Sequence, residues 1–276
     1  MPRSDLKALL DARFSDAPEQ VENSHTDLLC AMAGRGSCRA FLDQAVPKAL
    51  LETLSAVALS SPTKSDLQQR DIIFVQDAST RQALADLVAG QGWVADAPMI
   101  ALFCGNNRRQ RLLHAWHDVA FANDHLDAFF NAAVDGAIAL GAFVTAAEAV
   151  GLGCCPISAV RNEATAVSDL LGLPDHVFPV AGLAIGYPAK AAQISKRLPL
   201  CTTVHFDRYD ETGIQKAVAE YDQDRAATQP YQAQRFPDTF GVSDNYGWST
   251  DKVRQYSQPE RASFGAFVRA KGFSLD

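Results

Sequence analysis

The feature that most constrains this chain of 276 residues is one long apolar segment, residues 128–150, which is rich in alanine and glycine. Four polar residues interrupt the segment: Asn131, Asp135, Thr145 and Glu148. Such interruptions are typical of a buried helix rather than of a membrane span. We therefore expect a helix from about residue 126 to residue 150, closed by Gly151. A helix that is apolar on most faces must also be covered on most faces.

Small side chains follow one side of this predicted helix. Ala133, Ala137 and Gly141 recur every four residues, and beside them lie Ala132, Gly136 and Leu140. Small side chains let two helices approach closely. The cover is therefore either the interior of the same subunit or a second copy of the chain, and the sequence leaves both open.

Shorter apolar runs predict the remaining elements. Buried strands are expected at residues 71–77, 99–105, 154–160 and 177–187. Helices are expected at residues 48–61, 81–89, 162–171 and 261–271, the first opened by Pro47 and the second capped by Thr80. Apolar periodicity weakens after Ala189, and residues 227–260 are typical of a loop. A single intertwined α+β domain with a wrapping C-terminal arm is the simplest architecture.

Composition limits the partners and the compartment. With 47% hydrophobic residues the chain can bury a substantial core. Its net charge of -7 repels polyanions, so we expect neither nucleic acid nor an anionic membrane as the main partner. The six cysteines show no CxxC spacing, and residues 1–16 contain no apolar stretch of a signal peptide. We therefore expect a cytoplasmic protein with reduced thiols.

The first candidate site is the stretch GRGSCRAF at residues 34–41. In an extended strand Arg35, Ser37 and Arg39 share one face, because side chains alternate with a period of two. Gly36 lets backbone N–H groups approach an anion. The stretch can therefore bind a phosphate, while two exposed salt bridges or a solvated turn remain as alternatives.

Two further stretches allow a similar choice. The glycines of GLGCCPISAVRN, residues 151–162, follow a helix and precede a strand, which is the reverse of the Rossmann order. They either let the backbone lie flat against a planar ligand or form an ordinary turn. Lys196 and Arg197, in a loop bounded by prolines, are either a second cationic arm for the anion or solvated side chains.

A cluster of aromatic and titratable residues follows the second predicted strand: His114, Trp116, His117, Asp118 and His125. Imidazole and carboxylate groups bind metal ions, but this spacing matches neither an HExxH nor a CxxC pattern. We therefore favour a mobile aromatic lid over a pocket and expect no metal.

Taken together, these stretches resemble the FMN-dependent nitroreductase family, and in particular its oxygen-insensitive, NADPH-preferring branch, which includes flavin reductases. The sequence RGSCRAF at residues 35–41 is similar to the family's Arg-Arg-Ser-x-Arg-x-Phe opening, with Gly36 where the family commonly has arginine. Four other matches follow in the family's order: the SS…LQ loop at 60–68, GLGCCPISAVRN, FPVAGLAIGYP at 178–188 and KRLP at 196–199.

The resemblance implies a set of FMN contacts. Arg35, Gly36, Ser37 and Arg39 would surround the phosphate and the polar edge of the flavin ring, and Lys196 with Arg197 would complete the phosphate site. Gln68 would reach the ring from the loop after the second helix. The ring face would lie against a four-residue backbone segment: Pro156, Ile157, Ser158 and Ala159.

The resemblance also implies a fold and an activity. The fold would be nitroreductase-like α+β, with a central mixed, mostly antiparallel sheet flanked by helices, in an intertwined homodimer. Residues 1–24 would be an N-terminal extension, 25–200 the FMN-binding core, and 201–276 an arm wrapping the core or the partner. Electrons would pass in pairs from NADPH or NADH through FMN to nitroaromatics, quinones or flavins by a ping-pong mechanism, with no catalytic side chain.

Two alternatives to this enzyme remain. One is a flavin-binding carrier or sensor without turnover. The other is a metal-dependent hydrolase that uses His114, His117 and Asp118.

Overall fold

The computed structural model describes residues 6–17, 26–88 and 92–276. The chain divides into two compact units, the smaller within residues 1–36 and 193–260 and the larger comprising residues 37–192 and 261–276. The predicted division at residues 24 and 200 is one of sequence segments, and it stays a prediction.

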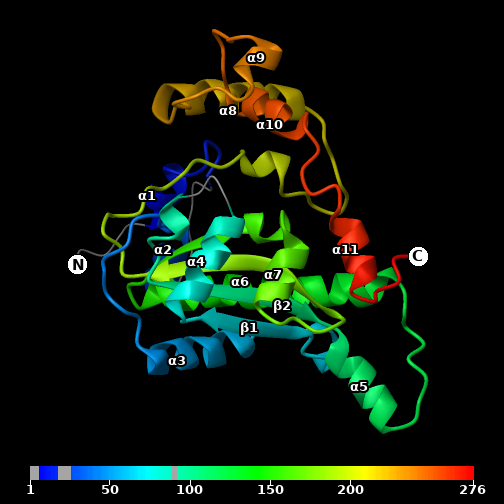
Figure 1. The fold of residues 1–276 in the computed structure, drawn as a ribbon. Helices are drawn as coiled ribbons and strands as arrows, with labels where there is room; N and C mark the ends of the chain where they lie inside the picture. Colours follow the sequence, from blue (N-terminus) through cyan, green and yellow to red (C-terminus); the bar gives the residue numbers. More distant parts are fainter. Residues whose placement is uncertain (1–5, 18–25, 89–91) are drawn as a thin grey trace. The chain divides into compact units, whose positions relative to one another are not determined.

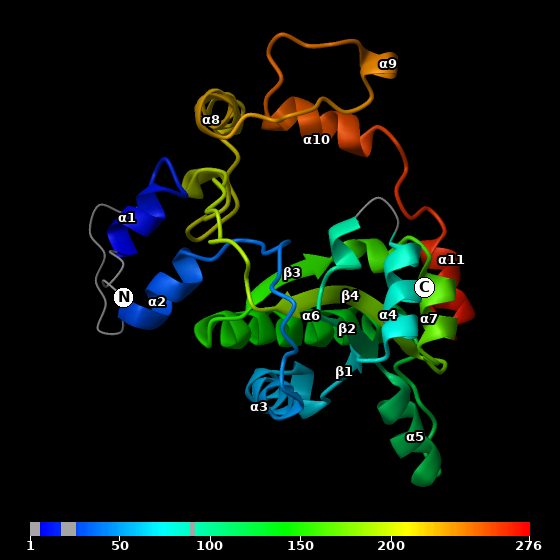
Figure 2. The ribbon, with the colours of Figure 1, turned by 60° about the vertical axis from the view of Figure 1, so that its left-hand side comes forward.

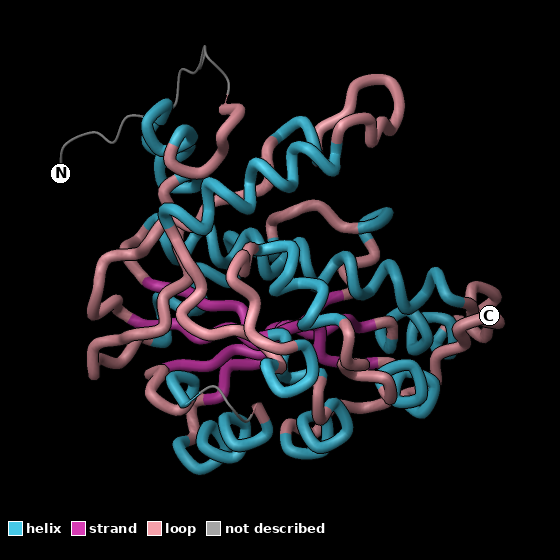
Figure 3. Tube along the Cα trace, turned by 90° about the horizontal axis from the view of Figure 1, so that it is seen from above, coloured by secondary structure: helices cyan, strands magenta, loops and turns pink. Residues whose placement is uncertain are grey.

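The larger unit is built on one sheet, drawn as arrows in Figure 1 and in magenta in Figure 3. The sheet has four strands in the order β1-β2-β4-β3. The strands are β1 (Arg70–Val75), β2 (Met99–Asn106), β3 (Gly153–Ile157) and β4 (Val177–Gly186). Every pairing among these strands is antiparallel. The four predicted strands are thereby confirmed, and β1 and β3 form the two edges of the sheet.

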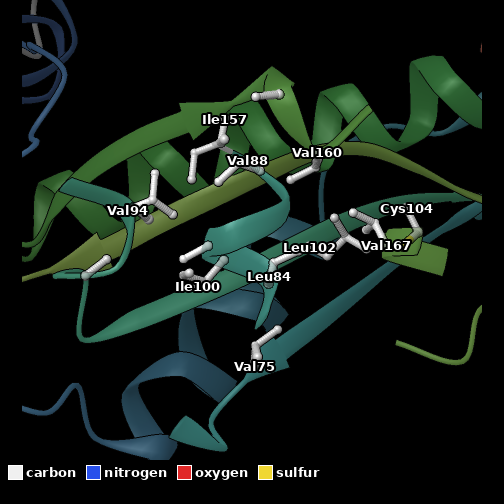
Figure 4. Close-up of a cluster of buried hydrophobic side chains, with 14 of the residues drawn as sticks. Val75, Leu84, Val88, Val94, Ile100, Leu102, Cys104, Ile157, Val160 and Val167 are labelled. Atoms are coloured by element: carbon white, nitrogen blue, oxygen red, sulfur yellow. The ribbon is translucent and has the colours of Figure 1, made fainter. Parts of the chain in front are cut away.

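Helices cover both faces of this sheet, which is why β2 is buried along its whole length. Ile100, Leu102 and Cys104 pack with α4 (Ala78–Leu87) and α7 (Ala164–Leu170) in one core cluster (Figure 4). The alternate residues of β2 face the second cluster, which contains α3 (Lys48–Leu59) and α6 (Leu126–Ala149): Met99, Ala101 and Phe103. The strand period of two therefore distributes apolar side chains to both layers.

Helix α6 is the long helix expected from the sequence, and Gly151 follows it with a left-handed φ of +86°. Its buried side contacts the sheet so closely that a Cβ on Gly136 would lie 3.0 Å from the carbonyl oxygen of Cys104. On another side Phe130, Val134 and Ile138 are exposed by 60%, 37% and 36%. Of the described helices, α6 is the one long and apolar enough to cross a membrane by length and composition alone, and 39% of its most apolar window is buried.

The remaining elements of the larger unit are short. They are η1 (Lys64–Asp66), η2 (Gly92–Val94), α5 (Arg108–Trp116), η3 (Ser158–Arg161) and α11 (Phe264–Ala270). One predicted cap is wrong. The predicted cap was Thr80, but helix α4 begins three residues earlier, after Asp77. The Asp77 carboxylate accepts the Thr80 N–H at 2.7 Å and so caps a free N–H group of the first turn.

The smaller unit is helical (Figure 2). Its elements are α1 (Leu6–Asp11), α2 (Thr26–Ala33), η4 (Leu200–Thr202), α8 (Ile214–Thr228), α9 (Pro237–Phe240) and α10 (Trp248–Tyr256). Helix α1 packs on α2, and α8 packs on α10 with the rings of Tyr221 and Trp248 5.6 Å apart. The expectation of a loop at residues 227–260 is therefore wrong, since α9 and α10 lie within that range.

Candidate functional site

The extended segment after Gly36 lies beside strand β3 in the larger unit. The Cys38 N–H donates to the Cys154 carbonyl oxygen at 3.0 Å, and Leu42 N–H donates to Tyr187 oxygen at 2.8 Å. Cys38 is buried, whereas Ser37 and Arg39 on either side of it are exposed. This is the alternation that the sequence predicts for an extended strand, and it leaves the hydroxyl and the guanidinium on the same accessible face.

Two contacts fix this segment locally. A Cβ on Gly153 would lie 2.6 Å from the Cys38 sulfur, so a glycine is required where β3 begins. The guanidinium carbon of Arg39 lies 5.8 Å from the centre of the Trp93 ring, a cation–π contact that holds the exposed side chain. The second glycine of the GLG stretch therefore serves close packing of the candidate anion-binding segment.

Four residues at the end of β3 were predicted to contact the flavin ring, and they alternate between the surface and the core. Ile157 and Ala159 are buried in the apolar cluster under α4 and α7, while Pro156 and Ser158 are exposed. Any ligand on this edge would therefore meet Pro156, Ser158 and the backbone, and not the side chain of Ile157.

Arg261 is a cation near this edge that the sequence analysis missed. It donates from Nη2 to the Ser158 hydroxyl at 3.4 Å and from Nε to the Asn162 side-chain oxygen at 2.9 Å. Nothing in the local sequence around Arg261 indicates the contact, because about a hundred residues separate it from Ser158.

Gln68 lies at the opposite edge of the sheet, in the loop that leads into β1. It has a left-handed φ of 51°, and its amide donates to Asp66 at 3.1 Å. The fully buried carboxylate of Asp135 anchors this loop by accepting the backbone N–H groups of Lys64 at 3.0 Å and Gln69 at 2.9 Å. Gln68 also lines a small cavity of about 300 Å³ with residues of α5.

Three strand spacings separate the two edges within the larger unit, since β1 and β3 flank β2 and β4. At about 4.8 Å per spacing this is roughly 14 Å. A side-chain hydrogen bond spans about 3 Å. One subunit therefore does not bring Gln68 to the edge that carries Ser158.

In the smaller unit, predicted phosphate ligands from two distant stretches of the sequence lie around one cavity. Arg35, Lys196 and Arg197 line one cavity of about 1060 Å³, together with Arg13, which the sequence analysis did not single out. Two further cations, Arg225 and Lys252, also line it. Apolar and aromatic residues form much of the remaining wall, among them Leu6, Leu10, Phe14, Leu29, Tyr221 and Trp248. The cavity therefore combines an apolar interior with a group of guanidinium side chains.

These cations differ in their partners. Lys196 forms an ion pair with Asp224, and its backbone carbonyl accepts from the Tyr221 hydroxyl at 3.2 Å. Arg197 donates from Nη1 to the Ser195 hydroxyl at 2.6 Å. An anion at Lys196 would have to compete with Asp224, whereas Arg197 is held by a neutral hydroxyl.

Arg13 is the buried member of the group, with 7% exposure. Burial, and then the positive charges of Arg197 and Arg35, lower the pKa of Arg13 from its ordinary value. The cations are therefore close enough to repel one another. Because guanidinium groups bind phosphate oxygens in charge-assisted pairs, a phosphate is the ligand that would relieve this repulsion.

Gly36 also takes part in bringing the cationic segments together. A Cβ at this position would lie 2.4 Å from the carbonyl oxygen of Gln193, which is closer than real contacts allow. This explains why a glycine occupies a place where the resembling family commonly has arginine.

The candidate lid residues have structural contacts of their own. The His114 ring packs edge-on against Phe121 at 5.2 Å, and its Nδ1 lies 3.2 Å from the Val119 oxygen. Within residues 6–17, 26–88 and 92–276, no three His, Cys, Asp or Glu side chains form a group that could hold a metal ion. The cluster therefore gives no support to a hydrolytic metal centre.

Known proteins match this chain along most of its length. The nitroreductase family matches residues 32–187, and the nitroreductase family C-terminal domain matches residues 195–276. An oxygen-insensitive NADPH nitroreductase of Salmonella typhimurium is 36% identical over 200 residues, covering 72% of this chain and 80% of that protein. An FMN reductase [NAD(P)H] of Bacillus subtilis is 33% identical over 200 residues, covering 71% and 80%.

Solved structures agree in fold. The structure of B. megaterium NfrA2 has a TM-score of 0.82 and 29% identity, covering 90% of this chain and 98% of that one. The match extends over both compact units, since it covers nine tenths of the chain.

Proposed function

Because the chain belongs to the nitroreductase family, we propose that its clustered arginines hold the phosphate of FMN while NAD(P)H and an electron acceptor use the bound flavin in turn. The chain is an NAD(P)H-dependent oxidoreductase of the flavin and nitro reductase class. When bound, FMN supplies the redox chemistry by accepting and donating electrons in pairs. The protein supplies binding, orientation and charge.

The observation that carries the phosphate site is that Arg13, Arg35 and Arg197 line one cavity, where burial, and then the charges of Arg197 and Arg35, lower the pKa of Arg13. A phosphate monoester carries between one and two negative charges near neutral pH. Each desolvated guanidinium–phosphate bond contributes roughly 1.5–3 kcal/mol. Arg35 and Arg197 act as phosphate ligands, and Lys196 is available only when it leaves Asp224.

The resemblance assigns the ring contacts to Ser37, Arg39 and residues 156–159, and this assignment remains a proposal. The exposed Ser37 and Arg39 offer a hydroxyl and a cation that would stabilise negative charge on the polar edge of the ring. The β3 terminus, residues 156–159, offers backbone and the exposed Ser158. No side chain in this set acts as a nucleophile or general base, and the residues only bind and orient.

We further propose a homodimer in which the partner supplies Gln68. Gln68 precedes one edge strand of the sheet and Ser158 follows the other, and this separation favours a Gln68 that comes from a second chain. The exposed apolar side of α6, with Phe130, Val134 and Ile138, supports the same arrangement because it offers an apolar surface to a second copy.

Cytoplasmic location and small aromatic acceptors belong to the same proposal. The thiols of Cys38 and Cys104 are buried and form no disulfide, as in a reducing compartment. NADPH is proposed as the preferred donor. Arg108 is the candidate ligand for its extra phosphate among four basic residues, because Arg109 and Lys252 form ion pairs with Asp71 and Asp251 and Arg254 is buried. Equal kcat/KM for NADPH and NADH would refute the preference.

The direct test is the visible absorption spectrum of the purified protein before and after NADPH is added without oxygen. We expect a yellow protein whose flavin band bleaches with NADPH and returns when a nitroaromatic or quinone is added. A carrier would stay yellow, and a metal-dependent hydrolase would be colourless. Arg35→Ala and Arg39→Ala should each lower flavin retention, whereas full retention in both would overturn the site.

A further inference from the structure

Arg13 lies outside both segments that match the nitroreductase family, residues 32–187 and 195–276. Its guanidinium nevertheless makes four hydrogen bonds to backbone carbonyl groups of those segments. Nε and Nη2 donate to Ala33 oxygen at 3.1 and 2.7 Å, Nη2 donates to Arg35 oxygen at 2.7 Å, and Nη1 donates to Ser195 oxygen at 3.2 Å. One planar side chain thus joins the two chain segments that carry the candidate phosphate ligands.

The contacts continue on the other side of Arg197. The Arg197 N–H donates to the Arg13 carbonyl oxygen at 2.8 Å. The carboxylate of Asp16 accepts the N–H groups of Leu200 at 2.6 Å and Cys201 at 2.8 Å. Residues 13–16 therefore hold the cationic loop before, at and after Arg197.

The chemistry of these bonds distinguishes them from surface contacts. A guanidinium is a rigid fork, so the three carbonyl oxygens it contacts must keep fixed relative positions. Arg13 is buried, and hydrogen bonds from a charged donor are worth about 1.5–3 kcal/mol each when one partner would otherwise be left unsatisfied. Burying a third cation beside two others is unfavourable unless an anion shares the site.

We propose that residues 13–16, with Arg13 and Asp16 as its two contacting side chains, form an N-terminal clamp that positions Arg35 and Arg197 for the phosphate of the flavin. Arg13 is a positioning residue in this assignment, since it binds backbone and not the ligand. The clamp rests on the proposed function, because it presupposes that these arginines hold FMN.

The test compares two ligands that differ only in the phosphate. Apo-protein is titrated with FMN and with riboflavin, and the quenching of flavin fluorescence gives each Kd. In the wild-type chain we expect FMN to bind more tightly than riboflavin. In Arg13→Ala the Kd for FMN should rise roughly 10- to 100-fold, which corresponds to one or two lost charged hydrogen bonds. The Kd for riboflavin should change less than about threefold.

Three further variants separate the possible roles. Arg13→Lys keeps the charge but not the fork, so it should give an intermediate loss of FMN affinity. Asp16→Asn should weaken FMN in the same direction by a smaller factor. Arg208→Ala, which removes an exposed arginine of the same compact unit, should leave both Kd values unchanged.

The outcomes distinguish failure of the clamp from failure of the proposed function. If Arg35→Ala abolishes the preference for FMN over riboflavin but Arg13→Ala and Asp16→Asn retain it, the clamp is overturned. Equal weakening of both flavins in Arg13→Ala and Arg13→Lys would also overturn it, because that result describes a general structural role. If the wild-type chain itself does not discriminate between the flavins, the phosphate site of the proposed function fails. Should Arg13→Ala not fold, Arg13→Lys and Asp16→Asn decide the question.

Discussion

Gly36 shows how one missing side chain allows two segments to meet. A Cβ there would lie 2.4 Å from the Gln193 carbonyl oxygen. In Gly36→Ala the two backbones must separate, so we expect a loss of about 1–3 kcal/mol in the free energy of unfolding. FMN binding should weaken as well, because Arg35 adjoins this contact. Urea denaturation and FMN titration would measure the two effects.

A matched control for this substitution is Gly265→Ala in α11. Its new Cβ would meet only the Arg269 Nη1 atom, at 3.7 Å, which is ordinary contact. In a helix the exchange should be neutral or stabilise by up to about 1 kcal/mol. Equal stability of Gly36→Ala and the wild-type chain would contradict the close approach at Gln193.

His176 links the start of β4 to the C-terminal segment and makes stability depend on pH. Burial and then the positive charge of Arg111 lower the pKa of His176 from 6.5, although the Gly272 carbonyl at 2.9 Å opposes the shift. The unfolded chain therefore binds the proton at higher pH than the folded chain does. The contribution of His176 to the free energy of unfolding should be fully present well above pH 6.5, and it should be lost as the pH drops through that ordinary pKa.

The measurement is Tm against pH for the wild-type chain and for His176→Gln, whose amide can still donate to Gly272. The difference in Tm between about pH 8 and about pH 5.5 should be smaller in the variant. An identical pH dependence in the two chains would show that His176 does not contribute.

At the scale of elements, Asp135 connects the central helix to the loop that carries Gln68. Its two oxygens accept backbone N–H groups from Lys64 and Gln69, and it is fully buried. In Asp135→Asn an amide N–H would face one of these donors. We expect the free energy of unfolding to fall by about 1–3 kcal/mol and FMN to bind more weakly.

The control is Asp127→Asn, the same exchange at an exposed position of the same helix. It should cost less than about 1 kcal/mol, and it should not change FMN affinity. Comparable losses in the two variants would mean that anchoring of the loop by Asp135 is not the cause.

Elements with strong apolar patterns could be predicted from the sequence, and those held by distant polar contacts could not. The strands and α6 were predictable because burial on both faces produces long apolar runs. Helices α9 and α10 were missed because their apolar pattern is weak. In this part of the chain Asp251 is buried and accepts from Tyr246 at 2.9 Å, and such a contact leaves no periodic signal.

The same distinction holds for the residues of the candidate site. Arg35, Ser37, Arg39 and Arg197 were found because a motif and a resemblance mark them. Arg13 and Arg261 were not, since each acts across a long stretch of chain and lies in no motif. Arg13 contacts Ser195, 182 residues away. Sequence spacing therefore marks candidate ligands within a motif, whereas the residues proposed to position them appear only in the fold.

At the scale of the whole molecule, the proposed dimer determines whether the flavin site is complete. The exposed side of α6 carries Ile138, with 36% exposure, next to the small residues Ala137 and Gly141. In Ile138→Asp a carboxylate would lie in the proposed interface without a partner, and burial of such a charge costs several kcal/mol. We expect the variant to sediment as a monomer at micromolar concentration, where the wild-type chain should sediment as a dimer.

The same variant should lose FMN, because Gln68 of the partner would be absent from the ring. Analytical ultracentrifugation, with the absorbance ratio of flavin to protein, measures both losses in one experiment, and circular dichroism checks that the chain is folded. Val242→Asp, at a residue that is 80% exposed and distant in sequence from α6, should keep both the dimer and the colour. A folded Ile138→Asp monomer that retains FMN would show that each site is complete within one chain. A variant that stays dimeric would place the interface elsewhere, because a single buried carboxylate is enough to separate subunits only where the surfaces are in contact.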